Sequence, residues 1–470
     1  MTTTSDVKRI YFDITDIVEY ARVYNHVSGI QRVQIRIIAA LAKQHGGKRI
    51  VCSYWNRATS TYCQVPGDGV FTSSAFNSTE LLLKLRASTS HWLLDKSDAK
   101  KALAKYNGQK QYRALKKLEL YLTALLWPAG LKRFGIQPKQ SFNHIRPLEV
   151  QQLTDIPANE TLVFLGSNWN TPELLEVGKR HRQAGGQVVQ MIYDLIPHTA
   201  PQYFTQGLVN AFNQFLDSTP QYVSSFTCIS DWTASDLRQF VQHIPGYAPL
   251  IQTVPLAHEF AGFARNQDEI SPTDASLIQM VKQRPYVVCV GTVEVRKNGL
   301  ALLQAWQRLI GELGERTPQL VFGGKYGWKI DEFKDLLKRD AQLARYVTII
   351  ANASDQDLAY LYKHCAFNIY PSFYEGWGLP VGEAAWFGRT SVVSSATSMP
   401  EVCGDLVDYV DPNDIQAIAD KVKHFVLNPE IVKQREQRIR EAPLRDWLTV
   451  ANDFYDFVMA DSVSLGSQAA

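Results

Sequence analysis

The sequence predicts an α/β protein with two domains of similar size, and three observations support this. A chain of 470 residues is longer than one hydrophobic core usually organises. Apolar runs of strand length alternate with amphipathic runs of helix length from end to end, which is the pattern of doubly wound parallel sheets. A polar stretch at residues 264–274 interrupts this alternation and is the expected linker. We therefore expect one domain over residues 1–265 and a second over residues 276–446.

The expected strands are short runs rich in β-branched and aromatic residues. In the first domain they lie at residues 9–14, 49–54, 161–166, 187–193, 226–230 and 252–256. In the second domain they lie at residues 286–291, 319–323, 346–350, 367–371, 391–394 and 408–410. Because parallel strands need crossover connections, helices are expected between them. A last helix at residues 447–460 is expected to cross back to the first domain, and the tail at 461–470 is expected to be unstructured.

One stretch of the first domain departs from this alternation and is strongly basic. Between Lys96 and Lys139, inside an expected helical insertion at about residues 85–145, there are eleven Lys or Arg residues and two acidic ones. In the predicted helix 109–127, leucines and basic residues occupy opposite faces: Leu115, Leu118, Leu122 and Leu125 against Lys110, Arg113, Lys116 and Lys117. Such a helix suits an anionic membrane interface. The alternative is an ordinary surface helix packed on the first domain, with its basic face in solvent.

The composition argues against several classes of protein, among them nucleic-acid binders and disulfide-rich or zinc-binding proteins. A formal charge of +3, 45% hydrophobic and 20% charged residues are typical of a globular, enzyme-like protein. The basic residues are concentrated rather than spread over a domain face, which argues against a nucleic-acid partner. The six cysteines lie far apart without a Cys-x-x-Cys pair, so no disulfide framework or zinc site is expected. The N-terminal residues lack an apolar signal region and no apolar run reaches 18 residues, so the expected location is the cytoplasm, at the inner face of the cell membrane if the basic stretch binds lipid.

The most informative stretch is residues 367–391, which predict a strand, a glycine turn and a helix in succession. Gly376 and Gly378 let the backbone approach a ligand, and the helix N-terminus offers unpaired N–H groups to an anion. Glu375 and Glu383 flank this turn and suit hydroxyl groups rather than bare phosphate. A nucleotide sugar carries both kinds of group. The alternative is an ordinary strand-to-helix corner in which Glu383 serves the helix dipole.

A second candidate site is the loop at residues 291–299, which follows the first strand of the second domain. Arg296 and Lys297 enter the loop where that strand ends. Adjacent cations match a diphosphate, with Arg acting as a fork and Lys as a point charge. The alternative, two solvated charges at a helix start, is disfavoured because cations oppose the dipole there. Another glycine turn, at residues 322–328, follows the next strand and is a weaker signal on its own.

The first domain offers its own candidates. Gly29 opens a helix after the first strand and would let a ligand approach closely. Tyr193 and Asp194 end a strand at its carboxyl edge, where Asp194 is a candidate general base or ligand of an acceptor hydroxyl. The alternative for Asp194 is a turn-forming residue. His198 and His258 are expected to be loop histidines rather than catalysts.

A metal site is not expected. Asp355 and Asp357 could suggest one, because paired aspartates bind divalent cations in some sugar transferases. Here Ser354 precedes Asp357 by three residues, which predicts a capping box at the start of a helix over residues 355–365.

The second half of the chain resembles the retaining glycosyltransferases of family 4, and in particular bacterial surface-polysaccharide mannosyl- and hexosyltransferases. Four blocks carry the resemblance: Gly-Thr-Val-Glu-Val-Arg-Lys-Asn (291–298), Phe-Gly-Gly-Lys-Tyr-Gly-Trp (322–328), Tyr-Pro-Ser-Phe-Tyr-Glu-Gly-Trp-Gly-Leu-Pro-Val-Gly-Glu-Ala (370–384) and Ser-Met-Pro-Glu-Val-Cys-Gly-Asp (398–405). The first half is similar only in short pieces, among them Ser-Gly-Ile-Gln-Arg-Val and Tyr-Asp-Leu-Ile-Pro. The resemblance implies the GT-B fold, in which two Rossmann-like domains face each other across a cleft, the first binding the acceptor and the second the nucleotide sugar.

The resemblance also implies roles for individual residues. Arg296 and Lys297 would bind the donor diphosphate, Glu375 would hold the transferred sugar, and Glu383 would bond the nucleotide ribose. Asp194, a candidate from its own position at a strand end, is expected to act with the first three as a catalytic residue. The expected donor contacts are Gly291, Thr292, Gly324, Lys325, Gly376, Trp377, Gly378, Leu379 and Glu383. Gly29 and Tyr193 would line the acceptor side of the cleft. The family transfers sugars with retention of configuration and without a metal or other cofactor, taking a nucleotide-diphosphate sugar as co-substrate.

The expected activity is transfer of a hexose or deoxyhexose, from a donor of the GDP-mannose or UDP-hexose type, to a glycan or lipid-linked oligosaccharide. One departure from the family concerns acceptor activation, because Tyr193 occupies a position where members often have His. Two rival interpretations stay open. One is a nucleotide-sugar epimerase or phosphorylase on the same fold, and the other is an inactive relative that acts as a scaffold or binding protein.

Overall fold

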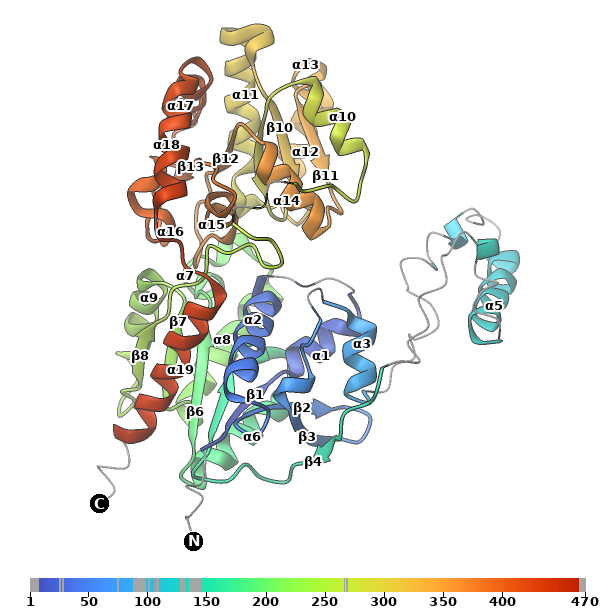
Figure 1. The fold of residues 1–470 in the computed structure, drawn as a ribbon, viewed down its shortest axis with the longest axis vertical. Coiled ribbons are helices and arrows are strands. Elements are labelled where there is room, and N and C mark those ends of the chain that lie inside the picture. The colour runs from blue at the N-terminus through green and yellow to red at the C-terminus, as the bar shows by residue number, and fades with distance from the viewer. Residues whose placement is uncertain are drawn as a thin grey trace. The chain divides into compact units, whose positions relative to one another are not determined.

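The computed structural model describes residues 8–24, 27, 29–73, 76–87, 99, 102–104, 106, 110–126, 132–134, 145–265, 267 and 269–464, and confirms the predicted alternation of strands and helices (Figure 1). Its contacts divide the chain into two compact units. The first unit comprises Met1–Ile156 with Gly166–Asn168, and the second comprises Pro157–Leu165 with Trp169–Ala470. The domain boundaries expected between residues 265 and 276, and at 446, stay a prediction.

The described part of the first unit has four strands in the order β4-β3-β2-β1. They are β1 (Ile10–Asp13), β2 (Ile50–Asn56), β3 (Thr61–Pro66) and β4 (Gln151–Gln152), accompanied by α1 (Thr15–Ala21), α2 (Gly29–His45) and α3 (Ser78–Lys84). β1 and β2 are parallel, as predicted, whereas β2 and β3 form an antiparallel hairpin. The sequence did not indicate β3 because the connecting residues 57–60 contain neither Gly nor Pro.

The basic stretch of the first unit contains the predicted helix, α5 (Lys110–Leu126). Its Leu120 is buried in a small cluster with Ala99, Ala102 and Leu103. Much of the range 96–139, including Trp127, lies outside the described residues. No helix in the part of the chain that the structure covers combines the length and apolar character needed to cross a bilayer.

The second unit begins with four parallel strands in the order β5-β6-β7-β8. They are β5 (Thr161–Phe164), β6 (Gln187–Ile192), β7 (Ser225–Cys228) and β8 (Leu250–Thr253), connected through α6 (Pro172–Gln183), α7 (Ile196–Thr199), α8 (Gln206–Ser218) and α9 (Asp231–Val241). β8 ends three residues before the predicted strand does. Pro255 has no N–H group to donate to a neighbouring strand, which accounts for the early end.

A six-stranded parallel sheet follows, and all six strands lie within a residue of their predicted positions. They are β9 (Tyr286–Val290), β10 (Gln319–Gly323), β11 (Val347–Ile350), β12 (Phe367–Tyr370), β13 (Ser391–Ser394) and β14 (Asp408–Val410). Their order is β11-β10-β9-β12-β13-β14. The chain therefore runs outward from β9 in both directions, which makes the carboxyl end of β9 the topological switch point where ligands usually bind.

Nine helices of the described chain accompany this sheet (Figure 1). They are α10 (Ser276–Gln283), α11 (Gly299–Leu313), α12 (Asp331–Arg339), α13 (Ala341–Ala344), α14 (Asp355–His364), α15 (Leu379–Trp386), α16 (Met399–Cys403), α17 (Ile415–Leu427) and α18 (Pro429–Glu441). The fully buried side chain of Trp306 in α11 is among the largest in the core, and its indole Nε1 donates to the carbonyl oxygen of Pro318 at 2.8 Å.

The helix start at Ser354 is a capping box, as predicted. Asp357 accepts hydrogen bonds from Ser354 and from the backbone N–H groups of Thr273 and Asp274. Its carboxylate thus caps α14 and binds the backbone just before α10. Among the described residues, no three His, Cys, Asp or Glu side chains gather where they could hold one metal ion. All six cysteines lie in the described segments, where they are buried and free.

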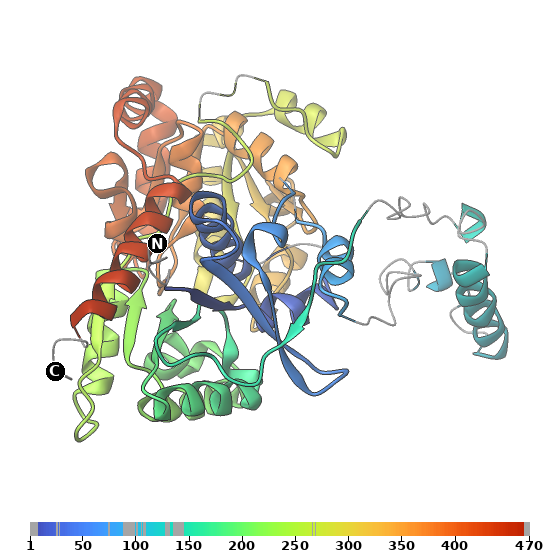
Figure 2. The same cartoon turned by 60° about the horizontal axis from the view of Figure 1, so that its bottom comes forward.

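The last helix, α19 (Trp447–Ser464), runs alongside β8, as both views show (Figures 1 and 2). Leu250 and Thr253 of β8 line one cavity together with Asp453 and Phe457 of α19. This placement confirms the predicted return of the helix toward the first half of the chain. The helix continues four residues beyond its predicted end, into the stretch that was expected to be unstructured.

Candidate active site

Arg296 and Lys297 stand at the switch point of the six-stranded sheet. They belong to a single 3-10 turn, Val295–Lys297, between β9 and α11. Asn298 follows in the left-handed conformation with φ 60°, and its side-chain amide donates to the carbonyl oxygens of Pro371 and Pro412. These bonds tie the turn to the loops after β12 and β14. α11 starts only at Gly299, so the two cations precede the helix rather than occupy its first turn.

Glu375 lies in the loop between β12 and α15, and the two glycines expected there shape the loop. A Cβ on Gly376 would meet the carbonyl oxygen of Tyr193 at 1.9 Å and the Cβ of Asp194 at 2.9 Å. Only glycine allows this close approach of the 193–194 backbone. Gly378 precedes Leu379, the first residue of α15. The loop thereby brings Glu375 beside Asp194.

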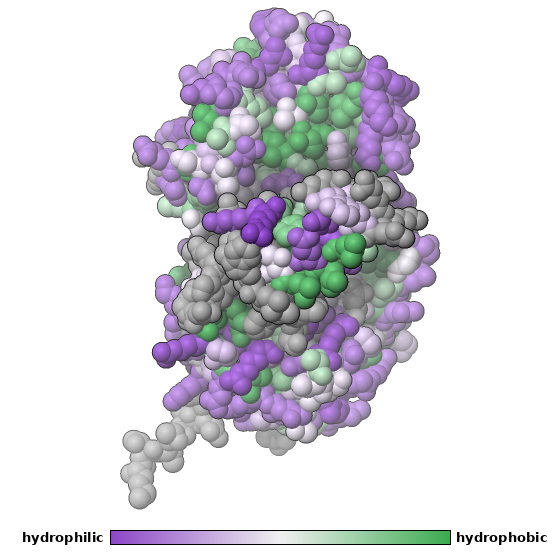
Figure 3. All heavy atoms as spheres, turned by 90° about the vertical axis from the view of Figure 1, so that its right-hand side faces the viewer, coloured by the Kyte–Doolittle hydropathy of each residue, from purple (hydrophilic) through white to green (hydrophobic). Residues whose placement is uncertain are grey.

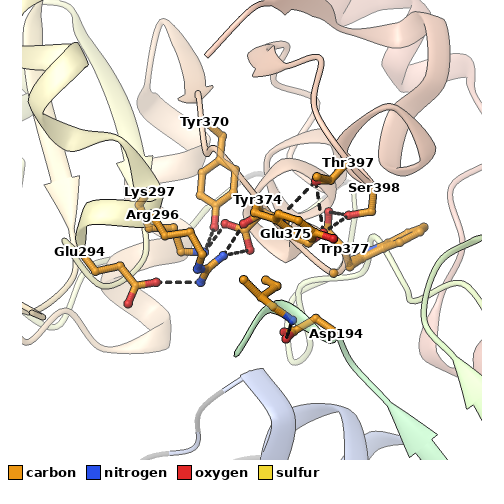
Figure 4. Close-up of polar contacts among 12 residues, drawn as sticks. Asp194, Glu294, Arg296, Lys297, Tyr370, Tyr374, Glu375, Trp377, Thr397 and Ser398 are labelled. Carbon is orange, nitrogen blue, oxygen red and sulfur yellow. Dashed lines mark hydrogen bonds and ion pairs between the residues drawn. The ribbon is translucent and has the colours of Figure 1, made fainter. Parts of the chain in front are cut away.

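The two cations and Glu375 form one ion cluster, shown in Figure 4. Lys297 Nζ lies 2.6 Å from Glu375 Oε1, and Arg296 Nη1 lies 2.8 Å from Glu375 Oε2. Arg296 Nη2 also donates to Glu294 Oε1 at 2.7 Å, and Lys297 Nζ donates to the hydroxyl of Tyr370. Three residues that the sequence singled out are therefore in direct contact, although 78 positions separate Lys297 from Glu375.

The charges of this cluster control one another. Burial raises the pKa of Glu375, but the attraction and hydrogen bonds of Arg296 and Lys297 outweigh it and lower the pKa to about 2. Burial lowers the pKa of Arg296, yet Glu375 and Glu294 outweigh that effect and raise it. For Lys297, burial together with the Arg296 charge prevails over Glu375 and lowers the pKa. Glu375 is thus a carboxylate at neutral pH, with both cations as its counter-ions.

Residues that the sequence did not single out hold the Glu375 loop in place. The backbone N–H of Glu375 donates to Thr397 Oγ1 at 3.1 Å, and Ser398 Oγ donates to the Glu375 carbonyl oxygen at 2.7 Å. Arg296 Nη1 donates to the carbonyl oxygen of Tyr374 at 2.5 Å. The blocks that carried the resemblance contain Ser398, Tyr370 and Glu294, but they predicted no role for these residues. Thr397 lies outside the blocks and had no signal.

A polar bridge joins α9 to the same loop. Tyr374 Oη donates to Asp236 Oδ2 at 2.5 Å and accepts from Trp232 Nε1 at 3.1 Å. Glu401 accepts from the backbone N–H groups of Asp231 at 2.6 Å and Trp232 at 2.9 Å, at the start of α9. A carboxylate at a helix N-terminus is favoured by the dipole. Asp236 and Trp232, which are 138 and 142 positions from Tyr374, thus connect α9 to the Glu375 loop.

Asp194 and Tyr193 lie at the end of β6, next to the ion cluster. Asp194 Oδ1 accepts the backbone N–H of Ile196 at 3.0 Å, the turn-forming contact that the alternative interpretation required. Burial raises the pKa of Asp194, while the nearby Arg296 charge opposes this. Tyr193 Oη donates to the carbonyl oxygen of Leu165 at 2.8 Å. Asp194 therefore has both the turn contact and electrostatic contact with the cluster.

Four of the remaining candidate donor contacts lie in two adjacent loops: Gly291, Thr292, Gly324 and Lys325. Gly291 borders the cluster, because a Cβ there would lie 3.9 Å from Lys297 Cε. Gly324 packs against Gly291, since a Cβ on Gly324 would meet the Gly291 carbonyl oxygen at 2.0 Å and the Thr292 nitrogen at 3.2 Å. The Lys325 carbonyl accepts the N–H of Val293 at 2.9 Å. These residues form one tight loop pair, and their contact with a donor stays a prediction.

Glu383 and Trp377 are buried. Glu383 Oε2 accepts the hydroxyl of Tyr362 at 3.1 Å, on the α14 side of the sheet. Within the part of the chain that the structure describes, the indole Nε1 of Trp377 has no hydrogen-bond partner. The expected contact of Glu383 with a nucleotide ribose is not tested by these positions and stays a prediction.

Gly29 lies in the first unit, where it is the first residue of α2 as predicted. Near it, Asp16 accepts hydrogen bonds from the side-chain amides of Gln31 and Gln34 at 2.9 and 2.7 Å, and from the hydroxyl of Ser167 at 2.8 Å. Because Asp16 is only partly buried, this polar cluster reaches the surface of the first unit. A role in acceptor binding stays a prediction.

Comparison with known proteins places these motifs in a family. Residues 277–445 match the family model "glycosyl transferases group 1". O-antigen chain mannosyltransferase B of Escherichia coli is 32% identical over 257 residues, which are 55% of this chain and 63% of that protein. The serotype-specific mannosyltransferase WbdA of Escherichia coli is 29% identical over 284 residues, which are 59% of this chain and 34% of that protein. The chain thus spans less than two thirds of the length of either relative.

Solved structures resemble the chain over nearly its whole length. HepE of Anabaena, determined in complex with UDP-glucose, gives a TM-score of 0.57 at 14% identity and covers 96% of this chain and 100% of that one. Sucrose-phosphate synthase of Thermosynechococcus elongatus gives 0.55 at 15% identity, with 97% and 100% covered. At such identities the likeness concerns the fold alone, and it confirms the predicted GT-B fold. Residues 277–445, which contain the motif blocks, therefore resemble the group 1 glycosyltransferases, and the chain has the GT-B fold.

Proposed function

We propose that this chain is a retaining, metal-independent glycosyltransferase that moves a mannosyl residue from a nucleotide-diphosphate sugar to a growing surface glycan. The observation that carries the proposal is the cluster of Arg296, Lys297 and Glu375 at the switch point of the second sheet. Two cations fixed at this position suit a diphosphate, and one carboxylate between them suits the hydroxyl groups of a sugar. We propose mannose rather than another hexose because both of these relatives are named mannosyltransferases.

In this proposal, Glu375 binds Arg296 and Lys297 until the donor diphosphate arrives. Without a donor, its carboxylate neutralises the two cations and keeps their side chains in position. A diphosphate adds negative charge beside them, so Arg296 and Lys297 transfer part of their hydrogen bonds to the phosphate oxygens. Glu375 then becomes available to sugar hydroxyls. During transfer the same cations stabilise the charge that grows on the leaving diphosphate, which is the usual role of preorganised donors.

Asp194 faces this cluster from the end of β6 and is proposed to bind the acceptor hydroxyl. Burial makes its carboxyl hold a proton more tightly than in water. A carboxylate with a raised pKa accepts a proton from a hydroxyl group more readily than an exposed one does. This role would compensate for Tyr193, which stands where family members often have His.

A transfer assay tests the proposed function. The full chain is incubated with GDP-mannose, UDP-glucose or other nucleotide sugars and with short α-mannose oligosaccharides, and the product is analysed by NMR for the configuration of the new bond. We expect a lengthened glycan with retained configuration. An epimeric nucleotide sugar that forms from the donor alone would instead support an epimerase, and release of sugar 1-phosphate from the oligosaccharide when orthophosphate is added would support a phosphorylase.

Site variants separate an enzyme from an inactive scaffold. Glu375→Ala, and the double change of Arg296 and Lys297 to Ala, are expected to abolish transfer. Lys338→Ala is the matched control, because the Lys338 side chain is 75% exposed on α12 and pairs only loosely with Asp335 at 3.7 Å. Unchanged turnover in either site variant would refute the site assignment.

We also propose that α5 attaches the protein to the inner face of an anionic membrane. Leu115, Leu118 and Leu122 are 64%, 59% and 46% exposed. They point away from the side on which Leu120 is buried, so this apolar stripe is not the face that packs in the local cluster. In Figure 3, which views the side where α5 lies in Figure 1, apolar side chains gather beside hydrophilic ones in the foreground. An apolar stripe with basic residues on the other face suits an interfacial helix.

Flotation with liposomes tests this attachment. The chain is expected to float with vesicles that contain phosphatidylglycerol and to stay behind with purely zwitterionic vesicles. Reversing the charges of Lys116 and Lys117 to Glu, or changing Leu115 and Leu118 to Ser, is expected to abolish flotation while transfer to a soluble oligosaccharide continues. Flotation that neither pair of changes affects would remove the lipid argument.

A further inference from the structure

A second pocket opens in the second unit beside the Arg296 turn. Its volume of about 560 Å³ lies within the range of small-molecule sites. It is lined where α11, α12 and α17 begin, by residues that include Leu300, Gln304, Asp331, Phe333, Phe373 and Asn413. Two of its lining residues contact Arg296 of the ion cluster. Glu294 lines the pocket and binds Arg296, and the backbone N–H of Phe373 donates to the Arg296 carbonyl oxygen at 2.9 Å.

Four aromatic rings continue from this pocket, and we call them the aromatic strip: Tyr203, Phe204, Trp328 and Phe373. Tyr203 stacks on Phe373 with an interplanar angle of 9° and 6.1 Å between ring centroids. Phe204 lies 6.2 Å from Trp328 between centroids. Trp328 Nε1 donates to the carbonyl oxygen of Tyr203 at 2.7 Å, which holds the two loops together. Trp328 remains 40% exposed, so the strip presents ring surface to solvent.

The chemistry of the pocket and the strip matches neutral sugar rings. The apolar C–H face of a pyranose packs on aromatic rings, and its hydroxyls pair with amide and carboxyl side chains. Gln304, Asn413, Asp331 and Glu332 supply such groups at the pocket. A nucleotide would also stack on aromatic rings, but Glu294, Asp331 and Glu332 outnumber Lys329 among the charged residues of the lining, which favours a neutral ligand.

We propose that the pocket and the aromatic strip form a subsite for hexopyranose residues of the acceptor glycan, next to the residue that receives the new sugar. This inference rests on the proposed function, because it assigns the strip to the same acceptor. It predicts that acceptors of several sugar units are used better than single sugars, since only the longer ones reach the strip. The binding energy of the distant residues then contributes to transfer at the reacting end.

The test uses Trp328→Ala in the full chain with α-linked mannose oligosaccharides of one to five units. For the longer oligosaccharides we expect the acceptor KM to rise about tenfold, the change that corresponds to losing one stacked ring. The KM for the nucleotide sugar and the rate with a single mannose are expected to stay unchanged. Trp328→Phe, which keeps an aromatic ring, is expected to recover most of the affinity. Leu427→Ala removes an exposed apolar side chain at the end of α17, outside the strip, and serves as the matched control.

Calorimetric titration without any donor separates this subsite from the activity. Mannopentaose is expected to bind the wild-type chain saturably and to bind Trp328→Ala about tenfold more weakly, whether or not transfer is detected. Equal binding by both chains, no saturable binding by the wild type, or a loss of GDP affinity in place of oligosaccharide affinity would overturn the proposal. If binding behaves as expected but no donor is turned over, the proposed function fails and the glycan subsite stands.

Discussion

Two buried carboxyl groups of this molecule, Glu375 and Asp13, have pKa values that are shifted in opposite directions. Asp13 ends β1 in the first unit and accepts hydrogen bonds from Tyr62 Oη at 2.8 Å and from the N–H and hydroxyl of Thr15 at 3.0 Å each. Burial raises its pKa from the ordinary 3.8 to about 7 despite these bonds, and the charge of Asp16 adds to the rise. Glu375 is as deeply buried, yet Arg296 and Lys297 lower its pKa to about 2.

The difference shows what keeps a buried carboxylate ionised. Neutral donors stabilise the charged form of Asp13, but they do not replace the lost solvation. Two adjacent cations do so for Glu375. The proposed function requires both cations to be in position before a diphosphate binds, and their pairing with one carboxylate offsets the free-energy cost of burying them. Asp13 has no such task and serves a hydroxyl network with Tyr62 and Ser53.

The two groups also give stability opposite pH dependences. The folded chain holds the proton of Asp13 between about pH 4 and pH 7, where the unfolded chain has released it, so this contribution to stability is lost as pH rises through that window. Glu375 stays ionised in the folded chain below its ordinary pKa. Its contribution is therefore present above about pH 4.5 and is lost as pH falls toward 2.

The largest expected effect comes from Arg296→Met, which leaves Glu375 with Lys297 alone of its two counter-ions. Glu375 and Glu294 lose the cation they share, so we expect a loss of about 3–5 kcal/mol in the free energy of unfolding. Transfer should fall about a thousandfold because a charge-stabilising donor is gone. Urea unfolding and initial rates measure the two effects, with Lys338→Met as the exposed control. Wild-type stability in Arg296→Met would mean that Glu375 does not depend on this cation.

The second-largest effect is expected from Asp13→Asn, which should change how the free energy of unfolding depends on pH. One pKa unit is worth about 1.4 kcal/mol, so the shift of Asp13 corresponds to about 4 kcal/mol lost between pH 4 and pH 7. The amide does not titrate and can keep the N–H of Thr15 as donor. Unfolding free energies at several pH values should therefore fall less steeply with pH in the variant than in the wild type. Parallel curves for the two chains would show that Asp13 ionises normally.

A smaller effect is expected from Tyr62→Phe, which removes one donor from Asp13. That hydrogen bond favours the charged form, so its loss raises the pKa of Asp13 further. At pH 8, where Asp13 is ionised, we expect a cost of about 1–3 kcal/mol, and a smaller one at pH 5, where the carboxyl is neutral. Urea titrations at the two pH values give the comparison. An equal loss at both would assign Tyr62 to packing alone.

The smallest effect tests how closely the Glu375 loop must be held. Tyr374→Phe keeps the carbonyl that accepts from Arg296 but removes the hydroxyl that bridges Asp236 and Trp232. We expect a loss of about 0.5–1.5 kcal/mol in stability and a decrease of a few-fold in kcat, with the pKa of Glu375 still low. Kinetics against donor concentration provide the measure. A loss of activity comparable to that of Arg296→Met would place Tyr374 in direct contact with the substrates.

Much of the fold followed from local patterns. Twelve strands were predicted near their observed positions, because each is a short apolar run between turns or helices. The capping box at Ser354 and Asp357 was predicted for the same reason, since it depends on residues three positions apart. The hairpin strand β3 was missed, because its turn has no glycine or proline and its strand is half polar. The short β4 was missed as well, since it is two residues long and depends on β3 for its pairing.

The sequence alone determined that Arg296 and Lys297 follow a strand, that Glu375 sits in a glycine turn, and that these motifs belong together, because residue type and spacing are local properties. Only the tertiary structure decided that both cations bind Glu375, that Tyr193 and Asp194 press against Gly376, and that α9 supports Tyr374. It also decided which buried carboxylate is ionised. That outcome depends on charges brought within a few ångströms by folding, and no one-dimensional pattern records such distances.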